Sequence, residues 1–385
     1  MIDNRLAKQG TRRRTFHTAL ILAALMVLLP FTAAAQTWHW SSQLIDAEGT
    51  DSAVRLDGNG NVHVSYRHTA GGQLKYGFLP AGGSRWFTMV VDQLLGDFLT
   101  GITVDQNDNP FICYTPGTLK IARFDGHEWK TQPVDPGGGL VGFYCNVRVG
   151  NDHKPQISWY IDGTFHLKHA ILENGSWIAQ SVDAQDLPGK INSMVLDTAD
   201  HPHLSYIGLF GPKLKYAHFD GSHWIRSIVD APDKGPAGGD RGMGNSIALD
   251  PQGNPMISYF NTEALKFAHL VDGQWKFETL DQFPPMAQWG WRNFRSTMAL
   301  DPEGHVHIVY ESVLGLKHAW WDGAQWKKQL LLPPGGTSFD GGMAIDAKGN
   351  LYYSYTDPAD RSLQLAMGRY VPTSITQMPN TQAPQ

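Results

Sequence analysis

Short stretches of alternating hydrophobic and polar residues run through most of the chain, and turns rich in Asp, Gly and Asn separate them. Residues 245–281 show this pattern most clearly. An Asp-Pro-Gln-Gly-Asn turn and a Val-Asp-Gly-Gln turn help to divide the segment into apolar runs at 246–249, 256–260, 265–270 and 275–280. Because a period of two residues is typical of a strand with one buried face, we expect four antiparallel strands here.

Similar units recur along the whole chain. The residues that open the first turn of each unit are Asp57, Asp105, Gly150, Asp197, Asp250, Asp301 and Asp346. Successive openings lie 48, 45, 47, 53, 51 and 45 residues apart. Repeated four-stranded units of this length predict an all-β fold, a seven-bladed β-propeller. Such units stack around one continuous core, so we expect a single domain at residues 36–371.

Particular residue types recur at fixed places in the units. The second strand carries an aromatic residue, the third strand often reads Leu-Lys-aromatic, and the fourth strand opens on Trp with Asp six residues later, except that Leu332 follows Trp326. The last unit ends without this Trp, but Trp40 and Asp46 keep the same step near the N-terminus. We therefore predict that an N-terminal strand closes the last blade and covers an otherwise exposed edge.

The two ends of the chain differ from the repeats. Residues 1–35 combine a basic start, an apolar run and Ala33-Ala34-Ala35, which predicts a signal peptide removed before Gln36. Arg13-Arg14 also fits a twin-arginine signal, with ordinary Sec export as the equal alternative and an uncleaved anchor as the third. Residues 372–385, rich in Thr, Pro and Gln, predict a disordered tail. We expect a secreted or periplasmic protein with no stable membrane insertion after cleavage.

The net charge of the chain indicates which classes of binding partner to expect. The net charge is −5, and cleavage removes five basic residues and one Asp, which leaves −9. An acidic protein disfavours nucleic acid as a partner. We expect a monomer that recognises a saccharide or glycan.

Cys113 and Cys145 fall in neighbouring units. A disulfide between them is one interpretation, and two unpaired core thiols are the favoured one.

The turns on one face of the predicted ring are repetitive, and the connections on the other face are not. The longest irregular connections are 230–244 and 281–295. They carry the residues that we assign to substrate binding, namely Arg241, Trp289, Trp291 and Arg292. Trp can stack on a sugar ring, and Arg can pair with an anionic group. The equal alternative is that these Trp residues cover blade ends while the Arg residues pair with local Asp.

One residue precedes each inner strand, so these residues should surround the channel mouth. They are Asp51, Leu99, Tyr144, Ile191, Gly244, Arg295 and Asp340. Asp340 and Asp51 are candidate proton-transfer groups, with Arg295 beside them, because two carboxylates can serve as acid and base in glycoside hydrolysis. Tyr144 is assigned to substrate binding. An Arg–Asp pair that only neutralises itself is the favoured alternative.

Metal and cofactor chemistry has little support in the sequence. The chain has 16 His, but most recur at equivalent positions around the ring, as His63, His203 and His307 do. We find no His or Cys pair at convincing ligand spacing, no nucleophile elbow and no phosphate loop. We therefore predict no metal site and no cofactor, although the sequence does not exclude a metal in the central channel.

The turn before the fourth strand carries Asp-Gly followed shortly by Trp, as in Asp272-Gly273-Gln274-Trp275. This pattern resembles the Asp-box of bacterial sialidase-like (BNR-type) β-propeller proteins, although one residue between Asp and Gly is missing. The resemblance implies a propeller and carries over no catalytic residue. It leads us to expect a single glycan-directed site, in a glycoside hydrolase or a polysaccharide lyase. The alternative is a non-catalytic carbohydrate-binding or protein-interaction scaffold.

Overall fold

The computed structural model of the protein describes residues 37–93, 99–134, 141–161, 164, 166–185, 188–208, 213–231, 244–261, 264–283, 294–333 and 341–371. These residues belong to one compact unit, 37–371. The predicted signal peptide and the predicted tail lie outside them. In the part of the chain that the structure describes, we find no helix suited to crossing a membrane.

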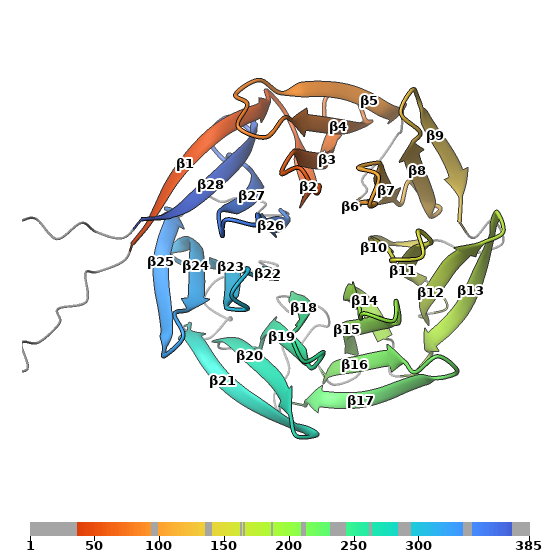
Figure 1. The fold of residues 1–385 in the computed structure, drawn as a ribbon, viewed down its shortest axis with the longest axis vertical. Coiled ribbons are helices and arrows are strands. Elements are labelled where there is room, and N and C mark those ends of the chain that lie inside the picture. Colours follow the sequence, from red (N-terminus) through yellow and green to blue (C-terminus); the bar gives the residue numbers. More distant parts are fainter. Residues whose placement is uncertain are drawn as a thin grey trace, which may run out of the picture. The chain divides into compact units, whose positions relative to one another are not determined.

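Seven four-stranded antiparallel sheets surround a central axis, which confirms the all-β, seven-bladed β-propeller (Figure 1). In six of them, four consecutive strands run from the axis outwards. Blade one holds β2 (Thr50–Leu56), β3 (Val62–His68), β4 (Gln73–Leu79) and β5 (Phe87–Gln93). Blade two holds β6 (Thr100–Val104), β7 (Pro110–Tyr114), β8 (Lys120–Phe124) and β9 (Trp129–Pro133). Blade three holds β10 (Val141–Val149), β11 (Pro155–Ile161), β12 (His166–Glu173) and β13 (Ser176–Asp183).

The remaining blades follow the same plan. Blade four holds β14 (Pro188–Leu196), β15 (Pro202–Gly208), β16 (Lys213–Phe219) and β17 (Trp224–Asp230). Blade five holds β18 (Asn245–Leu249), β19 (Pro255–Phe260), β20 (Ala264–Val271) and β21 (Gln274–Gln282). Blade six holds β22 (Ser296–Leu300), β23 (Val306–Ser312), β24 (Gly315–Trp321) and β25 (Trp326–Leu332). Blade seven holds β26 (Met343–Ile345), β27 (Leu351–Thr356) and β28 (Leu363–Val371), with β1 (Thr37–Asp46) outside β28.

The N-terminal strand closes the ring as predicted. β1 pairs with β28 from end to end, and Trp40 lies opposite Gly368. A side chain at Gly368 would meet the Trp40 ring at 2.8 Å, so glycine leaves the space that the indole fills. The Trp40 ring packs edge-on against His318 of blade six, with their centroids 5.5 Å apart. Blade seven therefore joins segments from both ends of the propeller.

The repeated Asp, Tyr and Lys residues form one recurring contact between blades. The Asp at the end of an outer strand accepts hydrogen bonds from the Tyr and the Lys of the next blade. The acceptors are Asp46, Asp92, Asp183, Asp230 and Asp281. Where Leu332 replaces the Asp, Gln364 stands at the matching Lys position of blade seven, and Tyr355 contacts Ser42 instead. The acid and the base are thus absent together, which avoids leaving a partly buried charge without its partner.

The repeated Trp residues also pack between blades. Trp129 lies edge-on to Tyr76 of the preceding blade at 5.1 Å, and Trp275 lies similarly on Tyr216 at 5.7 Å. Trp326 makes the equivalent contact with Phe267 at 5.2 Å. Edge-to-face aromatic pairs of this kind stabilise a core beyond the area that they bury. The interpretation of these Trp residues as packing between blades is confirmed.

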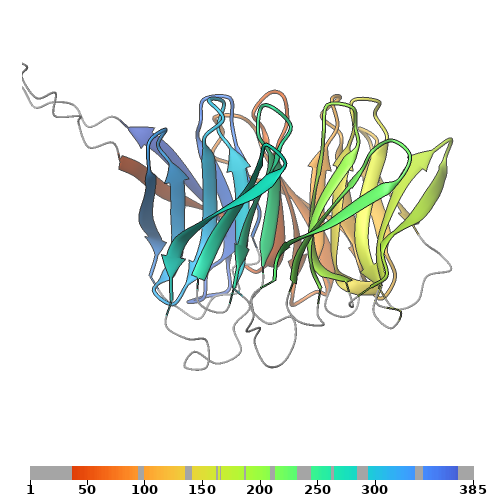
Figure 2. The ribbon, with the colours of Figure 1, turned by 90° about the horizontal axis from the view of Figure 1, so that it is seen from below.

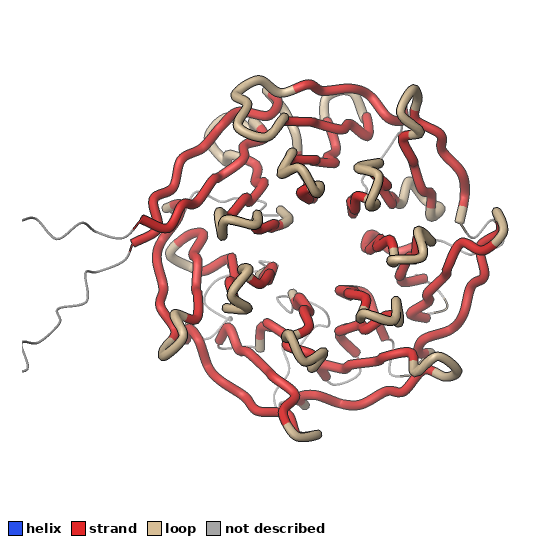
Figure 3. Tube along the Cα trace, in the orientation of Figure 1, coloured by secondary structure: helices blue, strands red, loops and turns tan. Residues whose placement is uncertain are grey.

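The repeated Asp residues of the tight turns have a structural role. Asp57 accepts the backbone N–H groups of Asn59 and Asn61 at 2.9 and 2.8 Å, and Asp250 does the same for Gln252 and Asn254. Strands and loops alone make up the described part of the ring (Figure 3), and the tight turns lie together on one face (Figure 2). We call this the turn side, and the opposite face the loop side.

Cys113 of β7 and Cys145 of β10 form a disulfide between blades two and three. The favoured sequence interpretation, two unpaired thiols, was therefore wrong. The alternation of strand residues shows that both side chains are buried, but not that they face each other across two blades. Their Cα atoms lie 6.3 Å apart, within the usual range for a disulfide.

Candidate functional site

The central channel contains a cavity of about 210 Å³ between the inner strands of the seven blades. The residues that we predicted at its mouth line this cavity wherever the structure describes them. They are Asp51, Leu99, Tyr144, Ile191, Gly244 and Arg295. Six of the seven blades thus bring the predicted residue to the channel cavity, and the seventh residue, Asp340, lies outside the described part of the chain.

Arg295 and Tyr144 meet across this mouth. The Arg295 Nη2 donates a hydrogen bond to the Tyr144 hydroxyl at 2.7 Å, and the guanidinium lies 5.1 Å from the centroid of the Tyr144 ring. These residues come from blades six and three and are 151 positions apart in sequence. Both side chains are half-buried. The pair therefore presents a cation and an aromatic ring together at the channel mouth.

The backbone around Arg295 is held by close packing. Phe294 is buried and stacks on Phe283, with ring centroids 5.8 Å apart. The N–H of Gly244 donates to the Phe294 carbonyl at 3.1 Å. A Cβ at Gly244 would lie 2.7 Å from the Arg295 Cα, so only glycine allows this approach of blades five and six. The N–H of Glu311 in turn donates to the Arg295 carbonyl at 3.0 Å.

Tyr144 lies at an irregularity in its strand. The pairing of β10 with β11 shifts register between Val141 and Cys145. Such bulges change the direction of a side chain relative to regular strand alternation. The next residue, Cys145, carries the disulfide to blade two, which holds the strand directly beside the tyrosine. The channel end of β10 is therefore fixed covalently.

Asp51 lies in the same cavity and makes an ion pair with its own blade. Its carboxylate accepts a hydrogen bond from the Arg67 Nε at 2.9 Å, and both side chains are largely buried. Asp51 has a φ of 52°, and β2 shifts register against β3 between Thr50 and Ala53. Among the described residues, Tyr144 and Arg295 are thus in direct contact, while Asp51 lines the same cavity and pairs with Arg67.

The other predicted site residues fall outside the described part of the chain. These are Asp340, Arg241, Trp289, Trp291 and Arg292. Their assignments to proton transfer and to saccharide binding stay predictions.

Two lining residues were missed by the sequence analysis. Arg55 of β2 and Arg148 of β10 line the channel cavity. Both stand two residues before the first turn of their blade. The matching positions elsewhere are Thr103, Val195, Ala248, Ala299 and Ala344. A charged residue at an inner position that is otherwise small or apolar was the signal that could have identified them.

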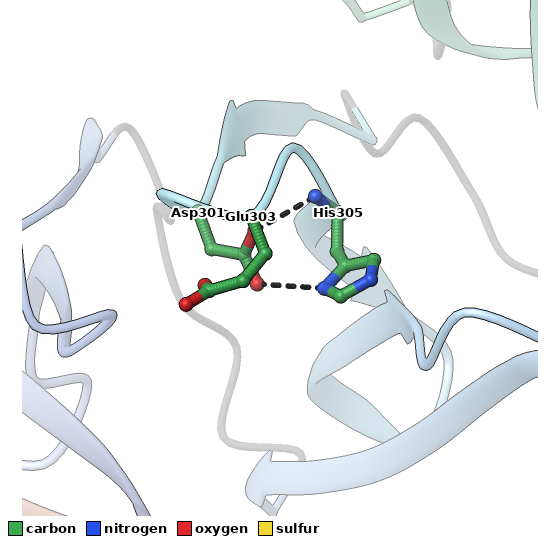
Figure 4. A group of neighbouring side chains, drawn as sticks. All are labelled: Asp301, Glu303 and His305. Carbon is green, nitrogen blue, oxygen red and sulfur yellow. Dashed lines mark hydrogen bonds and ion pairs between the residues drawn. The ribbon is translucent and has the colours of Figure 1, made fainter.

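One group of side chains has donor atoms close enough together for a metal ion. Asp301, Glu303 and His305 lie on the first turn of blade six, with one donor atom of each within 4.8 Å of the others (Figure 4). However, the Asp301 carboxylate already contacts the ring of His305 at 3.1 Å and that of His307 at 3.4 Å. Burial raises the pKa of Asp301, but the hydrogen bonds from His307 and His305 outweigh it and lower the value to about 2. The contacts of Asp301 with the two histidines therefore account for this grouping without a metal ion.

Buried histidines form part of the core. His169 contacts the Gln156 amide oxygen at 2.9 Å, and that amide donates to the Asp200 carbonyl at 2.8 Å, so His169 is the donor to Gln156. Burial lowers the pKa of His169 to about 3. His63 similarly contacts the Tyr76 hydroxyl at 2.7 Å. These contacts assign the repeated histidines to structure.

Comparison with known proteins identifies the fold. No protein-family model matches the sequence, and no curated protein matches it. A PL25 ulvan lyase bound to -[GlcA(1-4)Rha3S]- is similar in structure, with TM-score 0.57, 10% identity and coverage of 85% of this chain and 95% of that chain. A mutant of the Aleuria aurantia lectin AAL, in complex with Fucalpha1-6GlcNAc, has TM-score 0.51, 12% identity and coverage of 76% and 99%. BBS1N, in complex with ARL6DN, has TM-score 0.57, 9% identity and coverage of 88% and 98%.

At these identities the similarity shows the propeller fold alone. No family match supports the resemblance to BNR-type proteins beyond that fold.

Proposed function

We propose that this protein is an exported β-propeller that binds an acidic saccharide at the loop-side mouth of its central channel. The observation that carries the proposal is the contact between Arg295 and Tyr144 in the channel cavity. A guanidinium can bind a carboxylate or a sulfate through two parallel hydrogen bonds. An aromatic ring beside it offers an apolar surface to the sugar.

The charge distribution supports an anionic ligand. The charged residues that line the cavity are Asp51, Arg55, Arg148 and Arg295, and Asp51 is paired with Arg67. Among the residues that the structure describes, the lining of the cavity is therefore positive, although the chain without residues 1–35 carries a net charge of −9. A cleft with charges of one sign concentrates ligands of the opposite sign. Two structural neighbours, the ulvan lyase and the Aleuria aurantia lectin, make glycans a reasonable ligand class to test.

Binding is the part of the proposal that the described geometry supports best. Catalysis would need a carboxylate that transfers a proton. Of the two candidates, the Asp51 carboxylate is engaged by Arg67, and Asp340 lies outside the described residues. If the protein also catalyses glycoside hydrolysis or polysaccharide elimination, Asp340 is the carboxylate that we propose for proton transfer.

A binding screen tests the proposal. Protein without residues 1–35 is applied to polyuronates, sulfated polysaccharides and neutral polysaccharides of similar size. We expect binding to acidic members that weakens with salt, because the interaction is between charges. Release of reducing ends or of unsaturated uronates would add an enzymatic activity. No binding to any acidic saccharide would contradict the proposal and favour a protein-interaction scaffold.

We also propose export, with cleavage after Ala35 to give a secreted or periplasmic protein. The disulfide between Cys113 and Cys145 supports this, since such bonds persist in oxidising compartments. Mass spectrometry of protein from the periplasm and the medium should find an N-terminus at Gln36. Full-length protein found only in the cytoplasm would contradict export.

A further inference from the structure

Two arginines share the turn-side part of the central channel, away from the mouth. Arg55 and Arg148 extend from the inner strands of blades one and three and line the same cavity. Each lies four residues beyond a mouth residue of its strand, Asp51 or Tyr144, which corresponds to about 13 Å along an extended strand. The two guanidinium groups therefore belong to a different level of the channel from the Arg295–Tyr144 pair.

Neither arginine has a carboxylate partner in the part of the chain that the structure describes. The Arg55 Nη1 donates to the Val54 carbonyl at 2.9 Å, and the Arg148 Nη1 donates to the Val147 carbonyl at 2.8 Å. The acid nearest to Arg55 in sequence, Asp57, is already engaged by the Asn61 amide and the His63 ring. The acid nearest to Arg148 in sequence, Asp152, pairs with Lys154. Each guanidinium has five N–H donors, so most of them remain available for a ligand.

The two positive charges belong to residues that line the same channel cavity. Burial lowers the pKa of both arginines, and the charge of Arg55 lowers the pKa of Arg148 further. A protein normally pairs such charges, because an uncompensated charge in a low-dielectric site is costly. The matching positions of the other blades carry Thr, Val or Ala, which supply no negative charge.

We propose that the turn-side end of the channel binds a small inorganic oxyanion of the sulfate or phosphate class between Arg55 and Arg148. Tetrahedral oxyanions accept several hydrogen bonds at once from the planar guanidinium group. A cavity of about 210 Å³ is many times larger than the space that one water molecule needs. The ion would neutralise the repulsion between the arginines and link blades one and three through the channel. This site is independent of the saccharide proposed at the mouth.

Thermal unfolding in sulfate tests this inference. The melting temperature of the protein without residues 1–35 is measured while millimolar sulfate replaces chloride at constant ionic strength. We expect a saturable rise for the wild type. The Arg148→Gln variant should lose this rise and should melt higher than the wild type in sulfate-free buffer, because the repulsion is removed. Arg85→Gln, an exposed arginine outside the channel, is the matched control and should keep the rise.

Further variants keep the test decisive. If Arg148→Gln does not fold, Arg55→Gln carries the same expectation. A selenate soak of wild-type crystals should place an anomalous selenium peak between the two guanidinium groups. An equal rise in the channel variants and the wild type, no rise in the wild type, or a selenium peak elsewhere would overturn the inference. Loss of the rise in Arg295→Ala, with retention in Arg148→Gln, would place the anion at the mouth and would also overturn it.

Discussion

The Lys75 ammonium lies 2.6 Å from the Asp46 carboxylate, so that a residue of blade one pairs with the last residue of the closing strand. The Tyr66 hydroxyl donates to the same carboxylate oxygen at 2.6 Å. Burial raises the pKa of Asp46, but the hydrogen bonds from Lys75 and Tyr66 outweigh this and lower it. The closing strand therefore takes part in the same contact between blades as the outer strands of blades one, three, four and five.

Replacing Asp46 with Asn should destabilise the propeller. The change leaves the partly buried Lys75 without its negative partner, and hydrogen bonds to charged groups contribute about 1.5–3 kcal/mol. The midpoint of urea unfolding should fall accordingly. Asp125→Asn, which removes an exposed pair with Lys130, is the control and should have little effect. If the two variants unfold alike, the closing contact does not contribute as we describe.

Reduction of the disulfide should also lower stability. The bond joins residues 32 positions apart, and a loop of that length corresponds to about 3–4 kcal/mol in the chain-entropy model. Urea unfolding with and without reductant measures the loss, while thiol titration confirms reduction. A Cys113→Ala, Cys145→Ala double variant should not respond to reductant. An unchanged midpoint in fully reduced wild-type protein would contradict the prediction.

Acid should destabilise the fold partly through His169. The folded-state pKa of about 3 lies below the ordinary value of 6.5, so the unfolded chain takes up a proton first as the pH falls. The contribution of neutral His169 is thus complete above pH 6.5 and is lost between pH 6.5 and about 3. Between pH 6.5 and about 3, His169→Gln should reduce the slope of the unfolding free energy against pH by up to about 1.4 kcal/mol per pH unit. The exposed His127→Gln control should keep the wild-type slope, and equal slopes in all three proteins would contradict the account.

The fold could be predicted because its chemistry is local and repeated. The step from Trp40 to Asp46 marks β1 as an outer strand, although the rest of its blade lies about 300 residues away in sequence. Its turns need a capping Asp, as Asp57 shows, and this requirement is visible in nearly every unit. The cysteine pairing was not visible, because it depends on how two neighbouring blades face each other.

The site was predictable in position but not in its contacts. The repeat places Tyr144 and Arg295 at the start of the inner strands of their blades, and both residues line the channel cavity. Their hydrogen bond depends on the diameter of the closed ring and on two side-chain rotamers, which no repeated pattern specifies. The ion pair of Asp51 with Arg67 depends on a bulge and a positive φ, and strand alternation predicts neither.

Affinity for an acidic saccharide, compared between the wild type and Arg295→Ala, tests the central claim most directly. The ligand is the acidic polysaccharide that binds best in the screen, and calorimetry gives the dissociation constant. We expect Arg295→Ala to weaken binding about tenfold to a hundredfold, since an anchoring arginine is worth about 1–3 kcal/mol. Arg85→Ala, an exposed arginine that lies over the Phe87 ring, should bind like the wild type. Equal affinity of Arg295→Ala and the wild type would contradict a saccharide site at the Arg295–Tyr144 pair.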